Sequence, residues 1–594
     1  MPRLELAETS LRYGQQALML SRLRRRHAVR AAGLLDACGF SALEVFGGAT
    51  FEAQLRFLGE DPFERLRALA AAAPRTPLMA TLSGQMLVAH RHLPDDVVEA
   101  FVRLATEAGI RVFRLLDPLN DVANLATAVR AAKAAGAVVE GVVVCSDAPV
   151  AALAAVARGL AGLGCDAVCL HDPLGATGAA RAAALVSAAG EAASLPVTAS
   201  FCAQTGQAVL AYQAAHRAGA TRVDVSVSPL GGGAANPPAE AVIAGFAGTD
   251  DATAIEMEPV IRVAHFLDEI APLYSDSVDP ALFRLDVSAL RGLLPASAMG
   301  HGLAELSERG ALDRLPDVEA EISRVRHELG NPPLVTPLPE VITTQAVYNV
   351  FEGDRYATIS QEIKDYCLGL YGDPPEPVDR EVRRLVNGRE EPITCRPADL
   401  LEPAMATTRR ELIREGYPTP DAAAMVTYAL FPNAYLNLVR GDAVAERLGD
   451  EPEAAPAIAS SEPFAESDIP AADAQGEAAP ALPVRELTVE VDGQSYAVRV
   501  IGGVDSGVAA VAAPAAPAAP TVREGTVVSP MQGLLLKVNV KVGDHVALGE
   551  VVCVLEAMKM QNDITATRAG TVTEVYVKEG VVVSPRAPLI QIGA

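Results

Sequence analysis

Two kinds of hydrophobic pattern alternate along the first half of the chain. Longer segments with apolar residues at helical spacing occur, for example, at 95–108 and 122–135. Short runs rich in β-branched residues lie between such segments, at 43–46, 112–115, 138–144, 167–170, 196–199 and 222–227. Strands separated by helices of this length predict βαβ units and a parallel sheet. Seven or eight such units before residue 300 favour a closed (β/α)₈ barrel over an open sheet.

The pattern changes three times after this barrel. Residues 301–445 lack strand patterns and contain helical stretches that end at Pro-rich turns, which predicts an all-helical extension. Residues 446–522 form an acidic linker rich in Ala and Pro, in which alternation around an Asp-Gly pair predicts a short β-hairpin at about 485–502. Residues 523–594 consist of short Val-rich strands with Gly turns. We therefore expect an α/β chain whose barrel occupies 1–300 and whose last domain is all-β.

The composition narrows the class of protein. Lys and Arg number 49 and Asp and Glu number 74, so the net charge is −25, which argues against nucleic acid or an anionic membrane surface as the main partner. The chain is 50% hydrophobic, which excludes a disordered protein. Its 8 cysteines are scattered, as is typical of reduced thiols. No signal peptide and no apolar run long enough to span a bilayer are evident, so we expect a cytoplasmic protein.

An internal repeat divides the last domain into two halves. Val538-Asn539-Val540-Lys541-Val542-Gly543 returns as Val575-Tyr576-Val577-Lys578-Glu579-Gly580, and Gly533 and Gly570 keep the same offset. Two similar halves predict a small β-sandwich or flattened barrel with approximate two-fold symmetry. Glu556-Ala557-Met558-Lys559-Met560 lies between the halves, where a lysine flanked by methionines is expected on a tight, exposed turn.

This domain resembles biotinyl (biotin carboxyl carrier) domains over its whole length, and its EAMKM sequence matches their biotinylation motif. The resemblance implies that Lys559 is joined to biotin by an amide bond and that biotin carries a carboxyl group between active sites. Lipoyl domains share the fold, but their lysine normally lacks both methionines, which makes lipoate the weaker alternative. An ordinary solvated lysine is the other alternative. The Ala- and Pro-rich linker before this domain would act as a flexible tether. Such a tether gives the biotin arm an effective concentration of about millimolar at each active site.

The first 445 residues resemble the carboxyltransferase family that includes the oxaloacetate decarboxylase alpha subunit, pyruvate carboxylase and transcarboxylase. The likeness rests on Leu43-Glu44-Val45, Gly47-Gly48-Ala49-Thr50-Phe51, Arg56-Phe57-Leu58, Glu60-Asp61-Pro62-Phe63-Glu64-Arg65-Leu66, Leu119-Asn120-Asp121-Val122, Pro332-Pro333-Leu334-Val335-Thr336-Pro337 and Thr344-Gln345-Ala346-Val347. The resemblance implies a divalent metal at the carboxyl ends of the barrel strands, where it polarises the carbonyl of a keto acid and holds the enolate. It also implies a homo-oligomer.

The chain departs from the family at every metal-ligand position. Tyr13 replaces the ligand Asp, His171 replaces the carbamylated Lys, and Ser200 and Cys202 replace the H-x-H pair. Ala234 replaces the threonine that is thought to shuttle a proton. A metal acting as a Lewis acid supplies several kcal/mol, so its loss would slow the reaction by about a thousandfold or more. We therefore expect neither a metal nor a catalytic residue in this barrel.

Parts of the family's keto acid pocket remain: Arg12, Gln16 and Arg56 match it and are candidate substrate-binding residues. They favour an alternative in which the barrel is an active carboxyltransferase with an altered site.

The replacements also allow a second alternative, a new zinc site. Imidazole and thiolate are good Zn²⁺ ligands, and Glu8 and Asp172 lie close in sequence to the replaced positions. Serine and tyrosine are poor ligands, however, and a histidine at a strand end is more often simply hydrogen-bonded.

Together these observations predict a biotin carboxyl carrier subunit whose barrel is a non-catalytic scaffold. The expected partners are a biotin carboxylase subunit, a biotin protein ligase, and a separate carboxyltransferase or membrane decarboxylase subunit. One alternative is an active carboxyltransferase on pyruvate, oxaloacetate or another small 2-oxo acid. Another is a regulatory or biotin-storage protein without carboxyl traffic.

Overall fold

The computed structural model describes residues 3–448, with gaps at 250, 292–293, 295, 353 and 444, and then residues 484–491, 494–501, 526–529, 533–557, 560–579, 581–583 and 587–593. The chain divides into two compact units, Met1–Pro452 and Glu453–Ala594. Each unit contains its own hydrophobic core.

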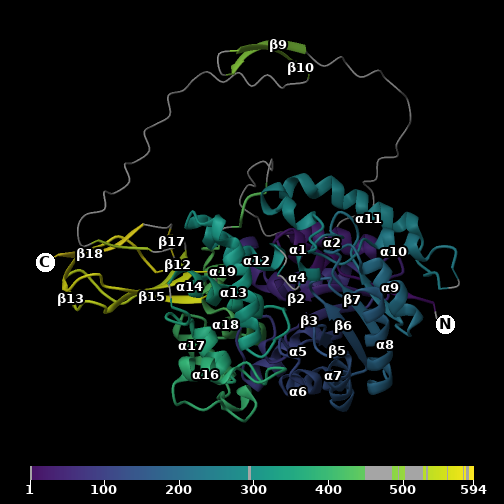
Figure 1. Ribbon diagram of the computed structural model, residues 1–594, viewed down its shortest axis with the longest axis horizontal. Coiled ribbons are helices and arrows are strands. Elements are labelled where there is room, and N and C mark those ends of the chain that lie inside the picture. Colours follow the sequence, from purple (N-terminus) through teal and green to yellow (C-terminus); the bar gives the residue numbers. More distant parts are fainter. Residues whose placement is uncertain are drawn as a thin grey trace. The chain divides into compact units, whose positions relative to one another are not determined.

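A closed barrel of parallel strands forms the centre of the first unit (Figure 1). In order around the barrel, the strands are β1 (Glu5–Glu8), β2 (Ala42–Gly47), β3 (Leu78–Leu82), β4 (Ile110–Leu115), β5 (Val138–Val144), β6 (Ala167–Asp172), β7 (Val197–Phe201) and β8 (Arg222–Val225). Strand β8 pairs with β1 and closes the barrel. The predicted (β/α)₈ fold is confirmed. The hydrophobic pattern had not singled out β1 and β3, which are short strands of 4 and 5 residues.

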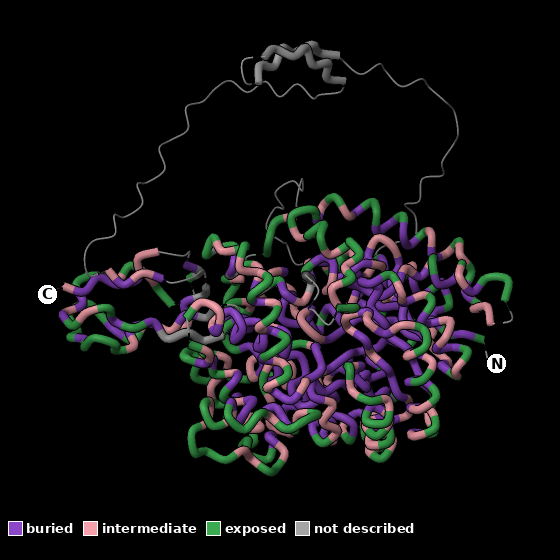
Figure 2. The backbone as a smooth tube through the Cα atoms, viewed as in Figure 1, coloured by how far each residue is buried: buried purple, intermediate pink, exposed green. Residues whose placement is uncertain are grey.

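Amphipathic helices surround the barrel and bury their alanine-rich faces against it. They are α2 (Arg25–Leu35), α4 (Pro62–Ala72), α5 (Asp95–Glu107), α6 (Ala126–Ala134), α7 (Val150–Gly162), α8 (Ala179–Ala193), α9 (Ala208–Arg217), α10 (Ala239–Phe246) and α11 (Met257–Ile270). Figure 2 shows this arrangement as buried strands inside a ring of helices with exposed outer faces. In α2, for instance, Ala28, Ala31 and Ala32 are buried, and such small side chains let helix and sheet approach closely.

Charged side chains form a layer inside the barrel. Arg114 on β4 donates from Nε to Glu140 Oε2 at 2.6 Å and from Nη2 to Asp224 Oδ1 at 3.1 Å. Glu140 also accepts from Arg222 and, at 2.6 Å, from the hydroxyl of Thr198. The side chains of Arg114, Glu140 and Asp224 are 5%, 1% and 0% exposed, so each charge depends on its partners rather than on water.

A helical region follows the barrel within the same unit. Its helices are α12 (Ala296–Glu308), α13 (Leu315–Glu328), α14 (Leu338–Phe351), α15 (Gln361–Cys367), α16 (Arg380–Asn387), α17 (Met405–Arg414), α18 (Ala422–Leu430) and α19 (Pro432–Arg440). Arg396 attaches the region to the barrel helices, since its Nη2 lies 2.8 Å from Asp95 Oδ2 on α5. Asp96 binds the backbone N–H groups of Ala404 and Met405, at the start of α17.

Two antiparallel sheets of four strands each build the C-terminal domain. One sheet has the order β11 (Thr526–Val528), β18 (Pro588–Gly593), β16 (Gly570–Val575), β13 (His545–Val546), and the other has the order β15 (Met560–Thr565), β14 (Val551–Ala557), β12 (Gly533–Val538), β17 (Val582–Val583). The two copies of the repeat contribute β12 to one sheet and β16 to the other, as two-fold symmetry requires. The predicted hairpin forms from β9 (Val484–Val491) and β10 (Gln494–Ile501).

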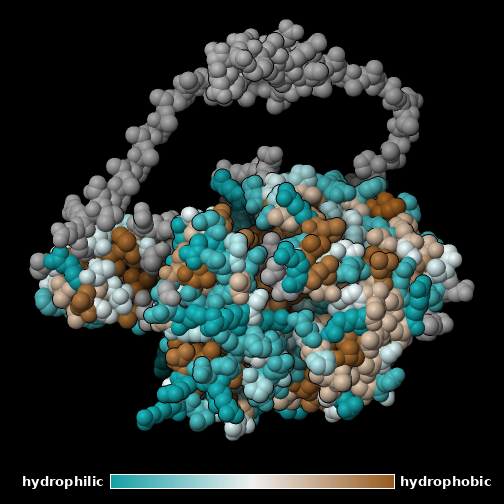
Figure 3. Space-filling model, viewed as in Figure 1, coloured by the Kyte–Doolittle hydropathy of each residue, from teal (hydrophilic) through white to brown (hydrophobic). Residues whose placement is uncertain are grey.

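The surface of the first unit mixes polar and apolar residues on the face that Figure 3 presents. Among the helices that the structure describes, none combines the length and the apolar character that crossing a membrane requires.

Replacing Arg114 with Met is expected to destabilise the barrel by about 3–5 kcal/mol, because the buried carboxylate of Asp224 loses its cation and that of Glu140 keeps only Arg222. Denaturant unfolding followed by circular dichroism measures this change. Burial raises the pKa of Glu140, but Arg114 and Arg222 outweigh burial and lower it to about 2, from 4.5. The stabilisation is therefore present above pH 4.5 and is lost as the pH falls toward 2, so the curves of wild type and variant should converge at low pH.

The matched control is Arg103→Met. Arg103 is 60% exposed and lies 3.9 Å from Glu107, so its loss should cost less than about 1 kcal/mol. If the two variants lowered the free energy of unfolding equally, the buried charged layer would not be the source of the stabilisation.

Candidate functional site

The four residues predicted to stand at the family's metal-ligand positions converge at the carboxyl end of the barrel. Tyr13 follows β1, within the irregular turn Ser10–Gly14. His171 is on β6 beside Ser200 on β7, to which it is paired in register. Cys202 directly follows β7, and its N–H donates to Asp172 O at 2.9 Å. Parallel strands bring their carboxyl ends to one face of a barrel, which is why residues so distant in sequence meet here.

These residues form a packed group, which we call the mouth cluster: Tyr13, His171, Ser200 and Cys202. The rings of Tyr13 and His171 meet edge to face, with centroids 5.8 Å apart at 83°. His171 Nδ1 lies 3.3 Å from Ser200 Oγ. The Cys202 thiol donates to Gly233 O at 3.5 Å. His171 and Ser200 thus contact each other, Tyr13 packs against the His171 ring, and Cys202 bonds to the neighbouring backbone.

Burial keeps the mouth cluster uncharged at neutral pH. It lowers the pKa of His171 to about 4, and the nearby Arg114 cation acts in the same direction. It raises the pKa of Cys202 to about 12. Burial, with Cys202 nearby, also raises the pKa of Tyr13 well above its ordinary value. The cluster therefore consists of a neutral imidazole, a hydroxyl, a thiol and a phenol.

This donor set does not fit a divalent cation. Such ions are held by carboxylates, thiolates and imidazoles, and here only His171 offers a ready lone pair. The Arg12 guanidinium, 5.8 Å from the Tyr13 ring, adds a positive charge. Within the described residues, no group of three or more His, Cys, Asp or Glu side chains is placed to hold a metal.

The zinc alternative gains no support from the neighbouring carboxyl groups. Asp172 accepts hydrogen bonds from the N–H groups of Leu174 and Thr177, within its own loop. Glu8 accepts from the N–H of Ser10 at 2.8 Å, and burial raises its pKa to about 7. Asp172 therefore serves the backbone of its own loop, and Glu8 Oε1 serves the N–H groups of Ser10 and Val227. Glu8 Oε2 has no hydrogen-bond partner among the described residues.

Ala234, the residue predicted to stand at the family's proton-shuttle position, also lies at the mouth. Ala234 is buried, and its N–H donates to Leu282 O at 2.9 Å. Its neighbour Gly233 accepts from the Cys202 thiol. A methyl group stands where the family places a hydroxyl.

Two of the three candidate substrate residues come together. A Cβ atom built on Gly48, whose φ is +56°, would lie 2.6 Å from Arg12 Nη2 and 2.7 Å from Gln16 Oε1. Only glycine leaves room for both side chains here. Arg12 Nε and Gln16 Oε1 have no hydrogen-bond partner among the residues that the structure describes. Arg56 is held by Glu52, with Nε and Oε1 2.7 Å apart.

Two charged residues that were not predicted as site residues also shape this end of the barrel. Glu44 Oε1 lies 3.4 Å from Arg12 Nη1 and accepts from the hydroxyl of Thr81. Arg114, in the layer described above, helps to keep His171 neutral. Both stand within runs of otherwise apolar strand residues, and that contrast could have revealed them.

The second candidate site, Lys559, lies outside the described residues, as does Met558. The strands on either side are described: β14 and β15 form an antiparallel pair that extends to Ala557 and Met560. Leu555 and Ile564 of this pair are buried in the core of the domain. The attachment of biotin to Lys559 stays a prediction.

Three family models match the chain. The family described as "HMGL-like" matches residues 3–267, "Conserved carboxylase domain" matches 299–499, and "Biotin-requiring enzyme" matches 525–592. The order of these matches follows the barrel, the helical region and the C-terminal domain.

Sequence relatives span nearly the whole chain. A pyruvate carboxylase subunit of Methanocaldococcus jannaschii is 35% identical over 94% of both proteins. The corresponding subunit of Methanothermobacter thermautotrophicus is 37% identical over 95% of both. Among solved structures, the carboxyl transferase domain of Rhizobium etli pyruvate carboxylase with pyruvate and biocytin matches with a TM-score of 0.71 at 24% identity, over 75% of this chain and 78% of that one. This structural match shows a common fold.

The protonation of Cys202 can be tested by alkylation at pH 8 followed by mass spectrometry. Since its pKa is about 12, only about one Cys202 thiol in ten thousand is ionised at that pH. Cys395 is exposed. We expect Cys395 to react well before Cys202 in the folded protein.

Two controls accompany this measurement: Cys395→Ser should remove the fast reaction, and unfolding should make Cys202 reactive. Rapid labelling of Cys202 in the folded protein would reveal a thiolate and so revive the zinc alternative.

Proposed function

Since this chain belongs to the family of biotin-dependent carboxyltransferases that includes these two pyruvate carboxylase subunits, we propose that it is the biotin carboxyl carrier subunit of a biotin-dependent carboxylase complex. One observation carries this proposal: an EAMKM motif lies between paired strands of a domain that matches biotin-requiring enzymes. Lys559 holds biotin through an amide bond. The carboxyl group then travels on the biotin arm.

The relatives' names support a division of labour between chains. Each name designates one subunit of a pyruvate carboxylase, which favours a separate biotin carboxylase subunit that charges biotin. A biotin protein ligase attaches the cofactor, and pyruvate is the proposed carboxyl acceptor. A further carboxyltransferase or membrane decarboxylase subunit is required if this barrel is inactive. The chain is proposed to act as a homo-oligomer in the cytoplasm.

For the barrel, we propose a scaffold role without metal-dependent chemistry. The mouth cluster supports it, because none of its members is an anion at neutral pH that would hold a divalent ion, and the metal-dependent stabilisation of an enolate requires such an ion. Ala234 adds to this, because a methyl group cannot transfer a proton.

An active carboxyltransferase is the second candidate. Two observations favour it: relatives 35% and 37% identical are named as pyruvate carboxylase subunits, and Arg12 and Gln16 converge at the barrel mouth with polar atoms available. These two side chains could hold a keto acid carboxylate. This candidate requires a route to the enolate that the mouth cluster does not provide.

Lys559→Arg is expected to abolish biotin incorporation when the full chain is expressed with a biotin protein ligase. An arginine side chain keeps the charge but is not a substrate for amide formation. Streptavidin blotting and intact mass measure the outcome.

Lys578→Arg is the matched control, because Lys578 is an exposed lysine of the same domain, in the second copy of the repeat. Biotin retained in Lys559→Arg, or lost in Lys578→Arg, would refute the assignment.

The barrel proposal is tested by elemental analysis and by oxaloacetate decarboxylation with the biotinylated full chain. We expect far less than one tightly bound divalent ion per chain, and turnover at least about a thousandfold below the 1–10³ s⁻¹ typical of enzymes. About one such ion, lost together with activity on chelation, would establish the active carboxyltransferase instead.

Restoring the four family ligands supplies a positive control. The variant Tyr13→Asp/His171→Lys/Ser200→His/Cys202→His should gain a divalent ion that wild type lacks. Because wild type is assayed directly, the test does not depend on whether this variant folds.

A further inference from the structure

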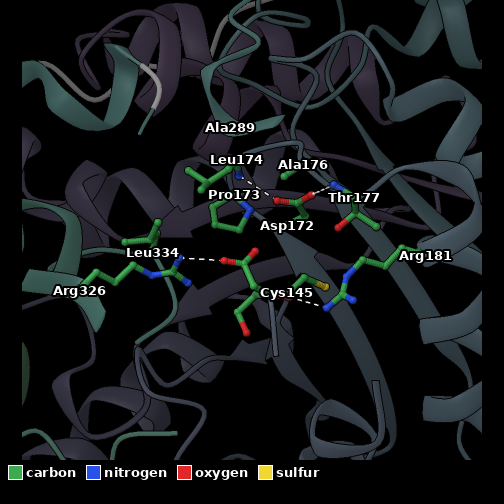
Figure 4. Close-up of a pocket in the computed structure, with 12 residues that line it drawn as sticks. Cys145, Asp172, Pro173, Leu174, Ala176, Thr177, Arg181, Ala289, Arg326 and Leu334 are labelled. Carbon is green, nitrogen blue, oxygen red and sulfur yellow. Dashed lines mark hydrogen bonds and ion pairs between the residues drawn. The ribbon is translucent and has the colours of Figure 1, made fainter. Parts of the chain in front are cut away.

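A cavity distinct from the mouth cluster lies at the carboxyl ends of β5 and β6, facing the helical region (Figure 4). The loop after β5 supplies Ser146 and Asp147, the last residue of β6 supplies Asp172, and α8 supplies Arg181. Arg326 of α13 lines it from the helical region. The cavity thus lies between two parts of the first unit that are far apart in sequence.

Two arginine side chains line the cavity together with two aspartates, and both arginines keep N–H groups without a partner in the described part of the chain. Arg181 Nη2 donates to Ser146 O at 2.5 Å and to Ala148 O at 2.8 Å, which fixes the guanidinium in place. Among the described residues, its Nε and Nη1 have no hydrogen-bond partner. Arg326 donates from Nε to Pro332 O at 3.1 Å and from Nη1 to Asp147 Oδ2 at 2.9 Å, and its Nη2 has no partner within the same described set.

The acceptors of the cavity do not balance these donors. Asp172 already accepts from the N–H groups of Leu174, at 3.0 Å, and Thr177, at 2.6 Å. The Asp147 side chain is 83% exposed, so water solvates much of its charge. The Arg326 side chain is only 14% exposed, so it depends more on partners within the protein. Spare guanidinium N–H groups therefore remain on both sides of the cavity, and a ligand rich in acceptors would satisfy them.

Apolar side chains complete the lining. Leu174 and Leu334 face the cavity, together with Pro173, Ala176 and Ala289. A bare inorganic anion would leave these surfaces unused, whereas an organic acid would bury them.

We propose that this cavity binds a small organic carboxylate, whose oxygens accept from Arg181 and Arg326 and whose short apolar body lies against Leu174 and Leu334. Such a ligand would join the β6 loop, next to His171, to helix α13. The site uses none of the residues of the mouth cluster or of the candidate keto acid pocket. The proposal therefore does not depend on whether the barrel is catalytic.

Titration calorimetry on the full chain tests the proposal with three probes: butyrate, inorganic phosphate and n-butanol. Butyrate presents a carboxylate with an apolar body, phosphate presents an oxyanion alone, and n-butanol presents an apolar body without a carboxylate. We expect butyrate to bind with a Kd of about 1 mM or below, which a fragment of this size can reach. Phosphate and butanol should each bind at least tenfold more weakly.

Two variants localise the binding. Arg181→Met removes one guanidinium, and Ala289→Phe fills the cavity while leaving every charge in place; each should weaken butyrate binding tenfold or more. The control Arg409→Met changes an exposed arginine on α17 and should leave the Kd unchanged.

Three outcomes would overturn the proposal. Butyrate binding that persists in Ala289→Phe would place the ligand elsewhere, for example at Arg12. Equal or tighter binding of phosphate would refute the choice of an organic acid. The absence of measurable butyrate binding would refute the site.

Discussion

The buried cation of Arg114 is the constraint on which the rest of the barrel depends. It lies between Glu140 and Asp224, so one guanidinium joins strands β4, β5 and β8 across the interior. A charge this deep is tolerated only when its partners surround it. The same charge acts on the mouth above it, where it helps to keep His171 neutral. Barrel closure and the chemistry of the mouth are thus electrostatically linked.

The mouth of the barrel combines a closed parallel sheet with a packed group of side chains. Closure of the barrel brings the carboxyl ends of β1, β6 and β7 to the same face. The side chains delivered there pack against each other, ring to ring and hydroxyl to imidazole. The uncharged side chains of the mouth cluster need no cation to balance them, whereas a group of anionic ligands would need one.

The C-terminal domain has an independent basis for its function. Its core includes Leu555, Ile564, Val572 and Ile590, all from its own strands. The paired β14 and β15 flank the predicted attachment lysine and belong to the same domain as this core. Changes in the barrel therefore leave the requirements for carrying biotin untouched.

The sequence alone determined much of this protein. Its alternating strands and helices determined the α/β barrel, the internal repeat determined the two-sheet C-terminal domain, and the motifs determined the family. Such features follow from local periodicity and covalent order, which a sequence records directly. The sequence also indicates that Tyr13, His171, Ser200 and Cys202 depart from the family's metal-ligand pattern.

Only the tertiary structure decided what these residues do together. It placed Tyr13 against His171, confined Arg12 and Gln16 over Gly48, and paired Arg326 with Asp147 beside a cavity. Protonation, donor balance and available space depend on burial and on partners that are distant in the chain. No local pattern encodes those quantities, because they arise when strands hundreds of residues apart close into one barrel.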